Sequence, residues 1–484
     1  MLLIALLIVP ALGAGAAYAL RTRTARLAVL AAVSAVHLGI VAVLWSGPER
    51  STVNGWLAND ALGMIVLTLV SVLFAAAVLY SVGFLRDEGP RAGRVLVPCL
   101  LGFLTATSLV CMSQHFALLW VGMEGTTLSI APLIFHRHDR RSLEAVWKYL
   151  MLSSVGIAFA LLGVFLLATS EPVTAGSRPL VFGDLLRGAR QLDRSWLRAA
   201  YVFALTGFGT KMGLAPLHWW KPDTYGESPS LVGALMAGAL TSCAFVGLAR
   251  FTAVALAAGL GDFARPLLIA FGLASLVVAT AFVIGQSDVK RLLAYSSVEH
   301  MGLLALGLGV GGASAYGSVL HVLNNGIAKC MLFLVAGNLV LATGSSAAAD
   351  MRGLFRVRPV SSGLLLAGLF AVTGSPPFGL FVSELAIVTG AIREHRVWVA
   401  VTMLVLLAII FAAIGGMIIS IVFGDTHGTA GGAGESIAPA RESGWLIAGP
   451  IGLAALVLML GVYIPAPLRD SLAQAARLLG GSAP

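Results

Sequence analysis

The sequence predicts an all-α polytopic membrane protein with about 14 transmembrane helices, two inverted five-helix repeats and two broken helices, numbers 7 and 12. Three observations predict this fold class. Of the 484 residues, 58% are hydrophobic and only 11% are charged, whereas a soluble domain carries about 25% charged residues. The apolar residues form runs of roughly 20, the length that crosses a bilayer as a helix. Two of these runs carry Gly and Pro at their centres.

Hydropathy divides the chain, which we treat as a single membrane domain over 1–484, into about fourteen spans. Short polar loops separate the spans, and none is long enough to fold as a soluble domain. The loop 424–442 is rich in Gly, Ser and Thr, and we expect it to be mobile. The expected spans are 2–20, 27–46, 61–85, 94–112, 115–135, 146–169, 196–220, 229–257, 265–285, 291–310, 314–343, 360–392, 397–423 and 443–465.

The seventh and twelfth spans differ from the rest because Gly and Pro interrupt them. The first reads TGFGTKMGLAPLHWW over 206–220, and the second reads TGSPPFGLFVSE over 373–384. Proline removes a backbone hydrogen bond, and a broken helix at membrane depth is tolerated where it lines a cavity or is buried in protein. Two such helices at matching positions are typical of inverted-repeat transporters. We therefore expect a first repeat over 94–257 and a second over 265–423.

The formal net charge of +9 reflects basic loops beside the membrane, which indicate topology and lipid contact and argue against nucleic-acid binding. The face that carries more Lys and Arg is expected in the cytoplasm, with both termini on the outer side of a bacterial inner membrane. The loops of this basic face are 21–26, 86–94, 136–141, 288–291 and 351–358.

Cofactor sites and soluble-enzyme motifs are not found in the sequence. The four cysteines form no Cys-x-x-Cys pair, which argues against an iron–sulfur cluster or a zinc site. A phosphate-binding loop, a dinucleotide fingerprint after a strand, H-E-x-x-H and G-x-S-x-G are likewise not found. We expect this chain to hold no cofactor, no metal and no catalytic site of its own.

Five ionisable residues lie deep inside apolar runs: Glu124, Lys211, Glu299, Lys329 and Glu384. An ionisable side chain at bilayer depth costs at least ~2.5–3.5 kcal/mol, so it needs a partner or a water-filled cavity. A carboxyl group kept neutral by burial would be the purely structural interpretation. A sparse set of alternating acids and bases in an apolar chain instead indicates a path for ions.

Lys211 lies in the first break, and Glu384 follows the second. Burial disfavours the charged form of a lysine, whereas a nearby carboxylate favours it. Moving a carboxylate by a few ångströms would therefore switch Lys211 between holding and releasing its proton.

Histidines extend this set of candidates. His321 lies eight residues before Lys329, so both should face roughly the same side of one helix. Glu299 and His300 are adjacent and point about 100° apart on a helix. We expect only one of these two to face the path, and His300 is favoured.

Two further candidates lie near span ends. His218, close to the end of the first broken helix, would serve as a cap or an inlet group. Lys148 stands four residues after Glu144, the spacing of an ordinary pair on a helix surface, although it could also reach the interior.

Long motifs in this chain resemble those of the antiporter-like, proton-translocating membrane subunits of the complex I superfamily. The runs that carry the resemblance are GTKMGLAPLHWWKPDTYGESPS (209–230), DVKRLLAYSSVEHMG (288–302) and GSPPFGLFVSE (374–384). WVGMEGTTLSIAPLIF with SLEAVWKYL, over 120–135 and 142–150, looks similar to the hydrogenase-4 component F branch. The resemblance covers roughly spans three to thirteen.

The resemblance implies a fold with two inverted five-helix repeats and a polar axis along the middle of the membrane. A glutamate on helix 5, lysines on helices 7 and 11 and a charged residue on helix 12 form this axis, and the matching positions are Glu124, Lys211, Lys329 and Glu384. Many members carry a further lysine on helix 8, where this chain has Ser242. A water chain between the lysines is then expected, with polar groups from Thr241, Ser242, Asn324 and Asn325.

The resemblance further implies a proton-translocating subunit of a complex I-like oxidoreductase, of the group 4 hydrogenase, formate hydrogenlyase or NADH-quinone oxidoreductase type. Other membrane subunits and a peripheral redox arm with iron–sulfur and metal sites would be its partners. One alternative is a subunit of a multisubunit sodium/proton antiporter or of an inorganic-carbon uptake transporter without redox coupling. Another is an inert scaffold. The pumped ion, proton or sodium, stays open at this point.

Overall fold

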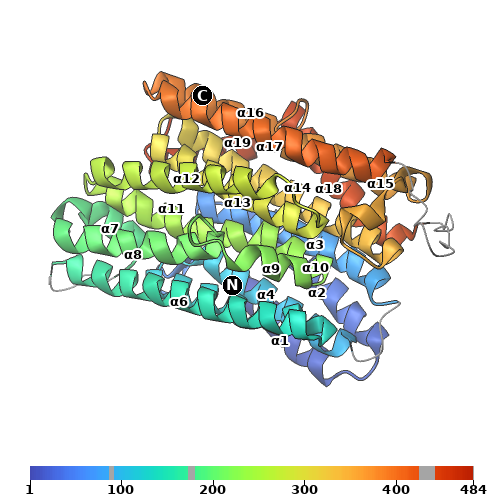
Figure 1. The fold of residues 1–484 in the computed structure, drawn as a ribbon. Helices are drawn as coiled ribbons and strands as arrows, with labels where there is room; N and C mark the ends of the chain where they lie inside the picture. The colour runs from blue at the N-terminus through green and yellow to red at the C-terminus, as the bar shows by residue number, and fades with distance from the viewer. Residues whose placement is uncertain (87–91, 173–179, 425–441, 483–484) are drawn as a thin grey trace.

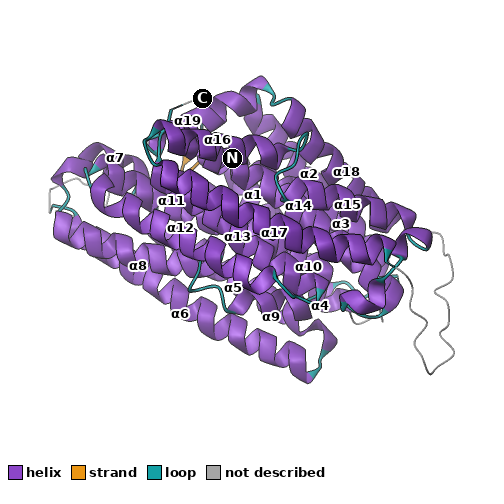
Figure 2. Cartoon of the chain, turned by 45° about the horizontal axis from the view of Figure 1, so that its top comes forward, coloured by secondary structure: helices purple, strands orange, loops and turns teal. Residues whose placement is uncertain are grey.

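The computed structural model describes residues 1–86, 92–172, 180–424 and 442–482. Within these ranges the protein is built almost entirely of helices, which lie side by side along one common direction (Figure 1). Short loops join them at their ends (Figure 2). The predicted all-α polytopic membrane fold is therefore confirmed, and the mobility expected for the loop 424–442 concerns residues that are mostly outside the described ranges.

Twelve helices in the described part of the chain are long and apolar enough to cross a membrane. One of them is assembled from two α-helical pieces and a π-helical turn, η3. In chain order they are α1 (Leu2–Ala19), α2 (Arg23–Trp45), α3 (Ala61–Phe84), α4 (Ala92–Met112), α5 (Phe116–Ile134), α6 (Arg140–Ser170), α10 with η3 and α11 (Ser230–Leu235, Met236–Leu240 and Thr241–Ala257), α12 (Gly261–Val283), α13 (Val289–Val310), α14 (Ala313–Thr343), α17 (Val397–Phe423) and α18 (Gly444–Val462).

The two remaining spans are broken where the sequence predicts. The seventh consists of α8 (Arg194–Met212) and α9 (Trp220–Glu227), and the twelfth of α15 (Pro359–Val372) and α16 (Gly379–Arg393). A glycine with positive φ follows each first half, Gly213 at 75° and Gly374 at 62°, a conformation that other residues adopt only with strain. With the twelve unbroken helices this gives the expected fourteen spans. The repeat boundaries stay a prediction.

Short strands, helices and 3-10 turns that hydropathy did not predict lie between the spans and after the last one. They are too short or too polar to form an apolar run of membrane length. They comprise the antiparallel strands β1 (Ser51–Thr52) and β2 (Leu57–Ala58), the helices α7 (Phe182–Gly188) and α19 (Ala466–Leu478), and the 3-10 turns η1 (Phe135–Arg137), η2 (Ala189–Gln191), η4 (Ala348–Met351) and η5 (Leu354–Arg356).

Burial separates a polar centre from a lipid-facing rim. In the 18-residue apolar stretch of each helix, 100% of the residues are buried within Ser230–Ala257 and 94% within α13, whereas only 28% are buried in α1 and in α17. An exposed apolar face is what a hydrocarbon environment requires. Around the centre, α6 packs on α8, α12 on α13, and α14 on α16. The central helices are therefore the ones that can hold a polar site away from lipid.

The structure buries more cations than the sequence suggested. Lys221, Lys290 and Arg250 are exposed by no more than 1%, like Lys211 and Lys329. Lys221 and Lys290 stand in polar runs that read as loops and fold inward here, whereas Arg250 lies inside the expected span 229–257 and was overlooked there. Arg250 pairs with Asp60 at 2.8 Å. Lys290 donates to the carbonyls of Gly226 and Ser228 at 2.7 and 2.6 Å, which satisfies the end of α9.

Candidate functional site

A lysine, a hydroxyl and a carboxylate meet between α5 and α8. The side chain of Lys211, in the last turn of α8, is fully buried, and its Nζ donates to Oγ1 of Thr127 at 2.5 Å. The same hydroxyl donates to Oε2 of Glu124 at 3.2 Å. Glu124 and Thr127 stand three residues apart on α5 and so share one face. The structure thus brings Glu124 and Lys211 together, with Thr127 between them.

Thr127 can work as a relay because a hydroxyl accepts and donates at the same time. Its single proton has two acceptors in reach, Oε2 of Glu124 at 3.2 Å and the carbonyl of Met123 at 3.3 Å. The ring of Tyr149 lies over the Lys211 ammonium, 5.2 Å from its centroid. Sequence reasoning missed Thr127. Its spacing of three residues from Glu124 was the available signal.

The same arrangement recurs between α13 and α14. Nζ of the fully buried Lys329 donates to Oγ of Ser296 at 2.6 Å, and Ser296 donates to Oε2 of Glu299 at 3.0 Å. Ser296 and Glu299 are again three residues apart, this time with the hydroxyl first. Each lysine of the expected axis therefore contacts a hydroxyl, which in turn contacts a carboxylate.

A histidine pair continues from this second cluster. Nδ1 of His300 and Nε2 of His321 are hydrogen-bonded at 3.0 Å, and Nδ1 of His321 is bonded to Oγ of Ser383 at 2.9 Å. Glu299 connects to Lys329 through Ser296, whereas His300 bonds His321 directly. Lys329 and His321 lie two turns apart on α14, and each meets a different neighbour on α13. Which of Glu299 and His300 faces the path stays a prediction.

His300, His321 and Glu384 form the one group of metal-ligand type found among the described residues. One donor atom from each lies within 4.8 Å of the others. The two imidazoles use their facing nitrogens to bond each other, an arrangement suited to passing a proton between rings. Glu384 is 8% exposed, and its Oε1 has no hydrogen-bond partner among the residues that the structure describes. The carboxyl group is therefore free to accept a proton from this side.

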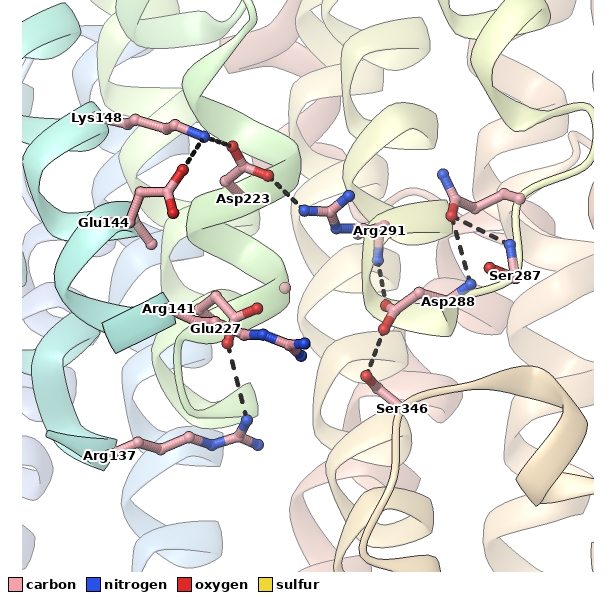
Figure 3. Close-up of a pocket in the computed structure, with 13 residues that line it drawn as sticks. Arg137, Arg141, Glu144, Lys148, Asp223, Glu227, Ser287, Asp288, Arg291 and Ser346 are labelled. Atoms are coloured by element: carbon pink, nitrogen blue, oxygen red, sulfur yellow. Dashed lines mark hydrogen bonds and ion pairs between the residues drawn. The ribbon is translucent and has the colours of Figure 1, made fainter. Parts of the chain in front are cut away.

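A polar pocket of about 490 Å³ opens at one end of the bundle, between α6, α9 and α13 (Figure 3). Asp223 stands at its centre, bonded to Lys148 at 2.7 Å and to Arg291 at 2.5 Å. Lys148 also pairs with Glu144 at 2.8 Å, as the spacing predicted. The Lys148 side chain is 44% exposed, so it lines the pocket and does not reach the interior.

His218 lies apart from these hydrogen-bonded chains. It is buried in the break between α8 and α9, and neither ring nitrogen has a hydrogen-bond partner in the described part of the molecule. Its ring stacks on Trp219 at 4.9 Å. The structure thus places His218 at the break without joining it to the lysines.

The centre of the bundle contains polar atoms that lack protein partners. The hydroxyls of Thr241 and Ser242 donate back to their own helix, to the carbonyls of Ala237 and Gly238 at 2.7 and 2.5 Å. Both amide atoms of the buried Asn325 have no partner among the described residues. Buried polar groups are bonded to protein or to ordered water, and a π-helical turn such as η3 often marks a functional position.

Lys221 is the buried residue that sequence reasoning overlooked. It opens α9, is 0% exposed, and donates from Nζ to Oγ of Ser297 at 3.0 Å. It was overlooked because it stands in the polar run after the first break, which reads as a loop. The signal was present in Trp220, which directly precedes it and is itself fully buried, since such large apolar side chains favour burial.

Comparisons with known proteins identify the family of the chain. The family described as NADH:quinone oxidoreductase/Mrp antiporter, TM, matches residues 113–411. A hydrogenase-4 component F homolog of Methylacidiphilum infernorum is 32% identical over 418 residues, which cover 84% of this chain and 85% of that protein.

Two solved structures share the fold over nearly the whole chain. A chain of the membrane-bound sulfane sulfur reductase, an archaeal respiratory membrane complex, matches with a TM-score of 0.88 at 22% identity and covers 99% of this chain and 98% of that one. A chain of the Mrp complex from Dietzia sp. DQ12-45-1b matches with a TM-score of 0.86 at 20% identity and the same coverage of 99% and 98%. These two structures show the fold, whereas the family match and the hydrogenase-4 relative establish that the chain belongs to the NADH:quinone oxidoreductase/Mrp antiporter transmembrane family.

Proposed function

We propose that this chain translocates protons as a non-catalytic membrane subunit of a complex I-like oxidoreductase. The observation that carries the proposal is the repeated chain of lysine, hydroxyl and carboxylate, Lys211–Thr127–Glu124 and Lys329–Ser296–Glu299. Each buried lysine in it has a hydroxyl that can accept its proton. Buried ionisable groups inside a membrane are expensive and mark ion and proton paths.

The residues take distinct roles along the path. Glu124 acts as an electrostatic switch, because its charge favours the protonated form of Lys211. Lys211 holds the first proton and Lys329 the central one. His300 and His321 connect this central cluster to Glu384, which acts as the gate toward the outside.

The polar pocket is the proposed inlet. It gathers acids and bases from two of the basic loops, 136–141 and 288–291, and α9 connects it to the interior. Asp223 lines the pocket, whereas Lys221, two residues earlier on α9, is buried. Lys148 belongs to this inlet, where it holds Asp223 in place. His218 remains a candidate inlet group in the break beside α9.

Orientation follows from the loops. The basic loops, and with them the pocket, lie on the cytoplasmic side, and both termini lie outside in a bacterial inner membrane. Reporter fusions at each terminus, one active only outside and one active only in the cytoplasm, test this placement. Activity of the cytoplasmic reporter at either terminus would contradict it.

Moving one charge against 100 mV costs about 2.3 kcal/mol, so a partner reaction must drive the transport. The hydrogenase-4 relative favours a redox reaction of the group 4 hydrogenase or formate hydrogenlyase type, carried out in a peripheral arm with iron–sulfur and metal sites. The rival function is a subunit of a sodium/proton antiporter or of an inorganic-carbon uptake system, and the name of the family also includes the Mrp antiporter.

Purification of the intact complex separates the two. We expect mass spectrometry to find hydrogenase-type subunits, and the complex in sealed vesicles to take up protons when its redox reaction runs. Co-purification with small antiporter subunits alone, together with sodium-driven proton exchange and no redox activity, would establish the rival.

A further inference from the structure

Lys221 has the environment of a proton carrier. Its side chain is 0% exposed, and the partner of Nζ is the hydroxyl of Ser297 at 3.0 Å. The ring of Tyr225 lies 5.9 Å away. No carboxylate of the described residues comes within ion-pair distance. Leaving a buried cation without a counter-charge is destabilising, so its position calls for a role other than stability.

Lys290, another buried lysine on this side of the bundle, shows what a structural lysine looks like here. It donates to two backbone carbonyls at the end of α9, at 2.7 and 2.6 Å, where a cation is favoured. Carbonyls cannot pass a proton on, whereas the hydroxyl that Lys221 contacts can. The two lysines therefore differ in the chemistry of their partners and not in their burial.

Lys221 lies beside the break that follows Lys211. A Cβ placed on Gly213 would stand only 3.0 Å from Nζ of Lys221 and closer still to its methylene groups. Gly213 is two residues past Lys211, so the ammonium of Lys221 approaches the end of α8 that carries Lys211. The missing side chain of Gly213 makes the room that Lys221 occupies.

On its other side, Lys221 reaches the central cluster. Its partner Ser297 is the neighbour in sequence of Ser296, which accepts a hydrogen bond from Lys329 at 2.6 Å. Two consecutive serines of α13 thus contact the ammonium groups of Lys221 and Lys329. Ser242 cannot replace Lys221, since its hydroxyl is bonded back to its own helix.

The second break repeats this arrangement. A Cβ on Gly374 would collide with the carboxylate of Glu384, as one on Gly213 would collide with Lys221. In both broken helices a positive-φ glycine after the first half makes room for an ionisable side chain from the second half. Lys221 is in this respect the counterpart of Glu384.

We propose that Lys221 is the proton-holding residue between Lys211 and Lys329, which rests on the proton path proposed above. An N–H bond of the Lys211 ammonium breaks as one forms on neutral Lys221. The proton then leaves Lys221 through the hydroxyls of Ser297 and Ser296, each of which gives up one proton and gains another, and an N–H bond forms on neutral Lys329. One positive charge moves with each transfer.

Three substitutions in the intact complex test this. Lys221→Met removes the titratable group at similar length, Lys221→Arg keeps a cation that cannot release its proton, and Lys221→His restores a group that titrates at lower pH. The measurement is the number of protons taken up per redox turnover in sealed vesicles, for complexes shown to be assembled. The difference in proton uptake per turnover between the wild type and Lys211→Ala gives the share of pumping that passes through this chain.

We expect the Met and Arg variants to lose that share by about a hundredfold or more, the size of effect that a missing proton-transfer group produces. We expect the His variant to keep part of it, with a pH profile displaced toward acid. Lys290→Gln, the matched control, should keep the full share in every complex that assembles.

Several results would overturn the assignment. Wild-type pumping by the Met or Arg variant would show that Lys221 carries no proton, as would a His variant whose pH profile is unchanged. A loss with Lys290→Gln as large as that with Lys221→Met would make the effect structural. If Lys211→Ala itself pumps like wild type, the proposed proton path is wrong. If Lys211→Ala loses pumping but the Lys221 variants pump like wild type, the path stands and Lys221 lies outside it. Should the Met variant fail to assemble, the Arg variant decides.

Discussion

Nζ of Lys211 lies 2.5 Å from Oγ1 of Thr127. Three of the four buried lysines in the described ranges donate to a hydroxyl in this way, the others being Lys221 to Ser297 and Lys329 to Ser296. A direct ion pair with a carboxylate would fix the proton on the lysine. A hydroxyl can accept a proton from the lysine and donate its own. For Lys211 and Lys329, a carboxylate bonded to that hydroxyl favours the protonated form of the lysine without pairing with it directly. This geometry therefore suits proton transfer better than a direct ion pair would.

Replacing Lys211 by Ala should abolish the redox-driven proton uptake that passes through this chain, because no other group on α8 can hold the proton next to Thr127. Assembly of the complex should be unchanged. Proton uptake into vesicles per turnover measures the effect, and Thr206→Ala on the same helix serves as the control. Wild-type uptake by Lys211→Ala would refute the assignment of this lysine.

Glu124→Gln should strongly reduce coupling, since it removes the charge that favours protonated Lys211, whereas Glu124→Asp should do less harm. The two variants are compared by protons pumped per turnover at equal redox rates. Equal pumping by both would mean that Glu124 is a structural hydrogen-bond acceptor and not a switch.

Thr127→Val keeps the shape of the side chain but removes the hydroxyl between Lys211 and Glu124. We expect pumping to fall by about a hundredfold, the lower end of the range for a lost proton-transfer group, and Thr127→Ser to restore it. The comparison of Val with Ser is decisive, because both substitutions change packing but only one removes the relay. Full pumping by Thr127→Val would eliminate the relay.

Arg250 and Asp60 connect α11 to the start of α3 through a buried ion pair at 2.8 Å. Arg250→Met leaves Asp60 buried and unpaired, which should destabilise the protein by about 3–5 kcal/mol. Adding Asp60→Asn should recover part of this loss. Thermal unfolding in detergent measures both, and an unchanged midpoint for Arg250→Met would show that the pair contributes nothing.

Ordered water should occupy the centre of the bundle beside Asn325, whose two amide atoms are buried without a protein partner in the described part of the structure. Such waters typically make about three hydrogen bonds. Asn324, the neighbour of Asn325 on α14, and Ser242 on α11 offer further polar atoms. A high-resolution map of the complex checks this. A dry, apolar centre in every state observed would rule out the hydrated connection.

The sequence by itself determined the fold class and supplied the candidates for the axis. Apolar runs of membrane length predict spanning helices because only a helix satisfies its own backbone in lipid. Gly213 and Gly374, with the prolines after them, predicted the breaks in the seventh and twelfth spans. Glu124, Lys211, Lys329 and Glu384 were recognisable because a lone charge in an apolar run is costly and needs a reason.

Tertiary structure decided which side chains meet. Thr127 and Ser296 are ordinary helix hydroxyls in the sequence and become candidate relays only because a lysine from another helix donates a hydrogen bond to each of them. Lys221 stands in a run polar enough to read as a loop, and burial came from the packing of α9 against α13. A charge inside an apolar run is visible in the sequence because its burial in a bilayer is costly. Hydrogen bonds between helices that are distant in the sequence depend on how those helices pack, and no local sequence pattern predicts that packing.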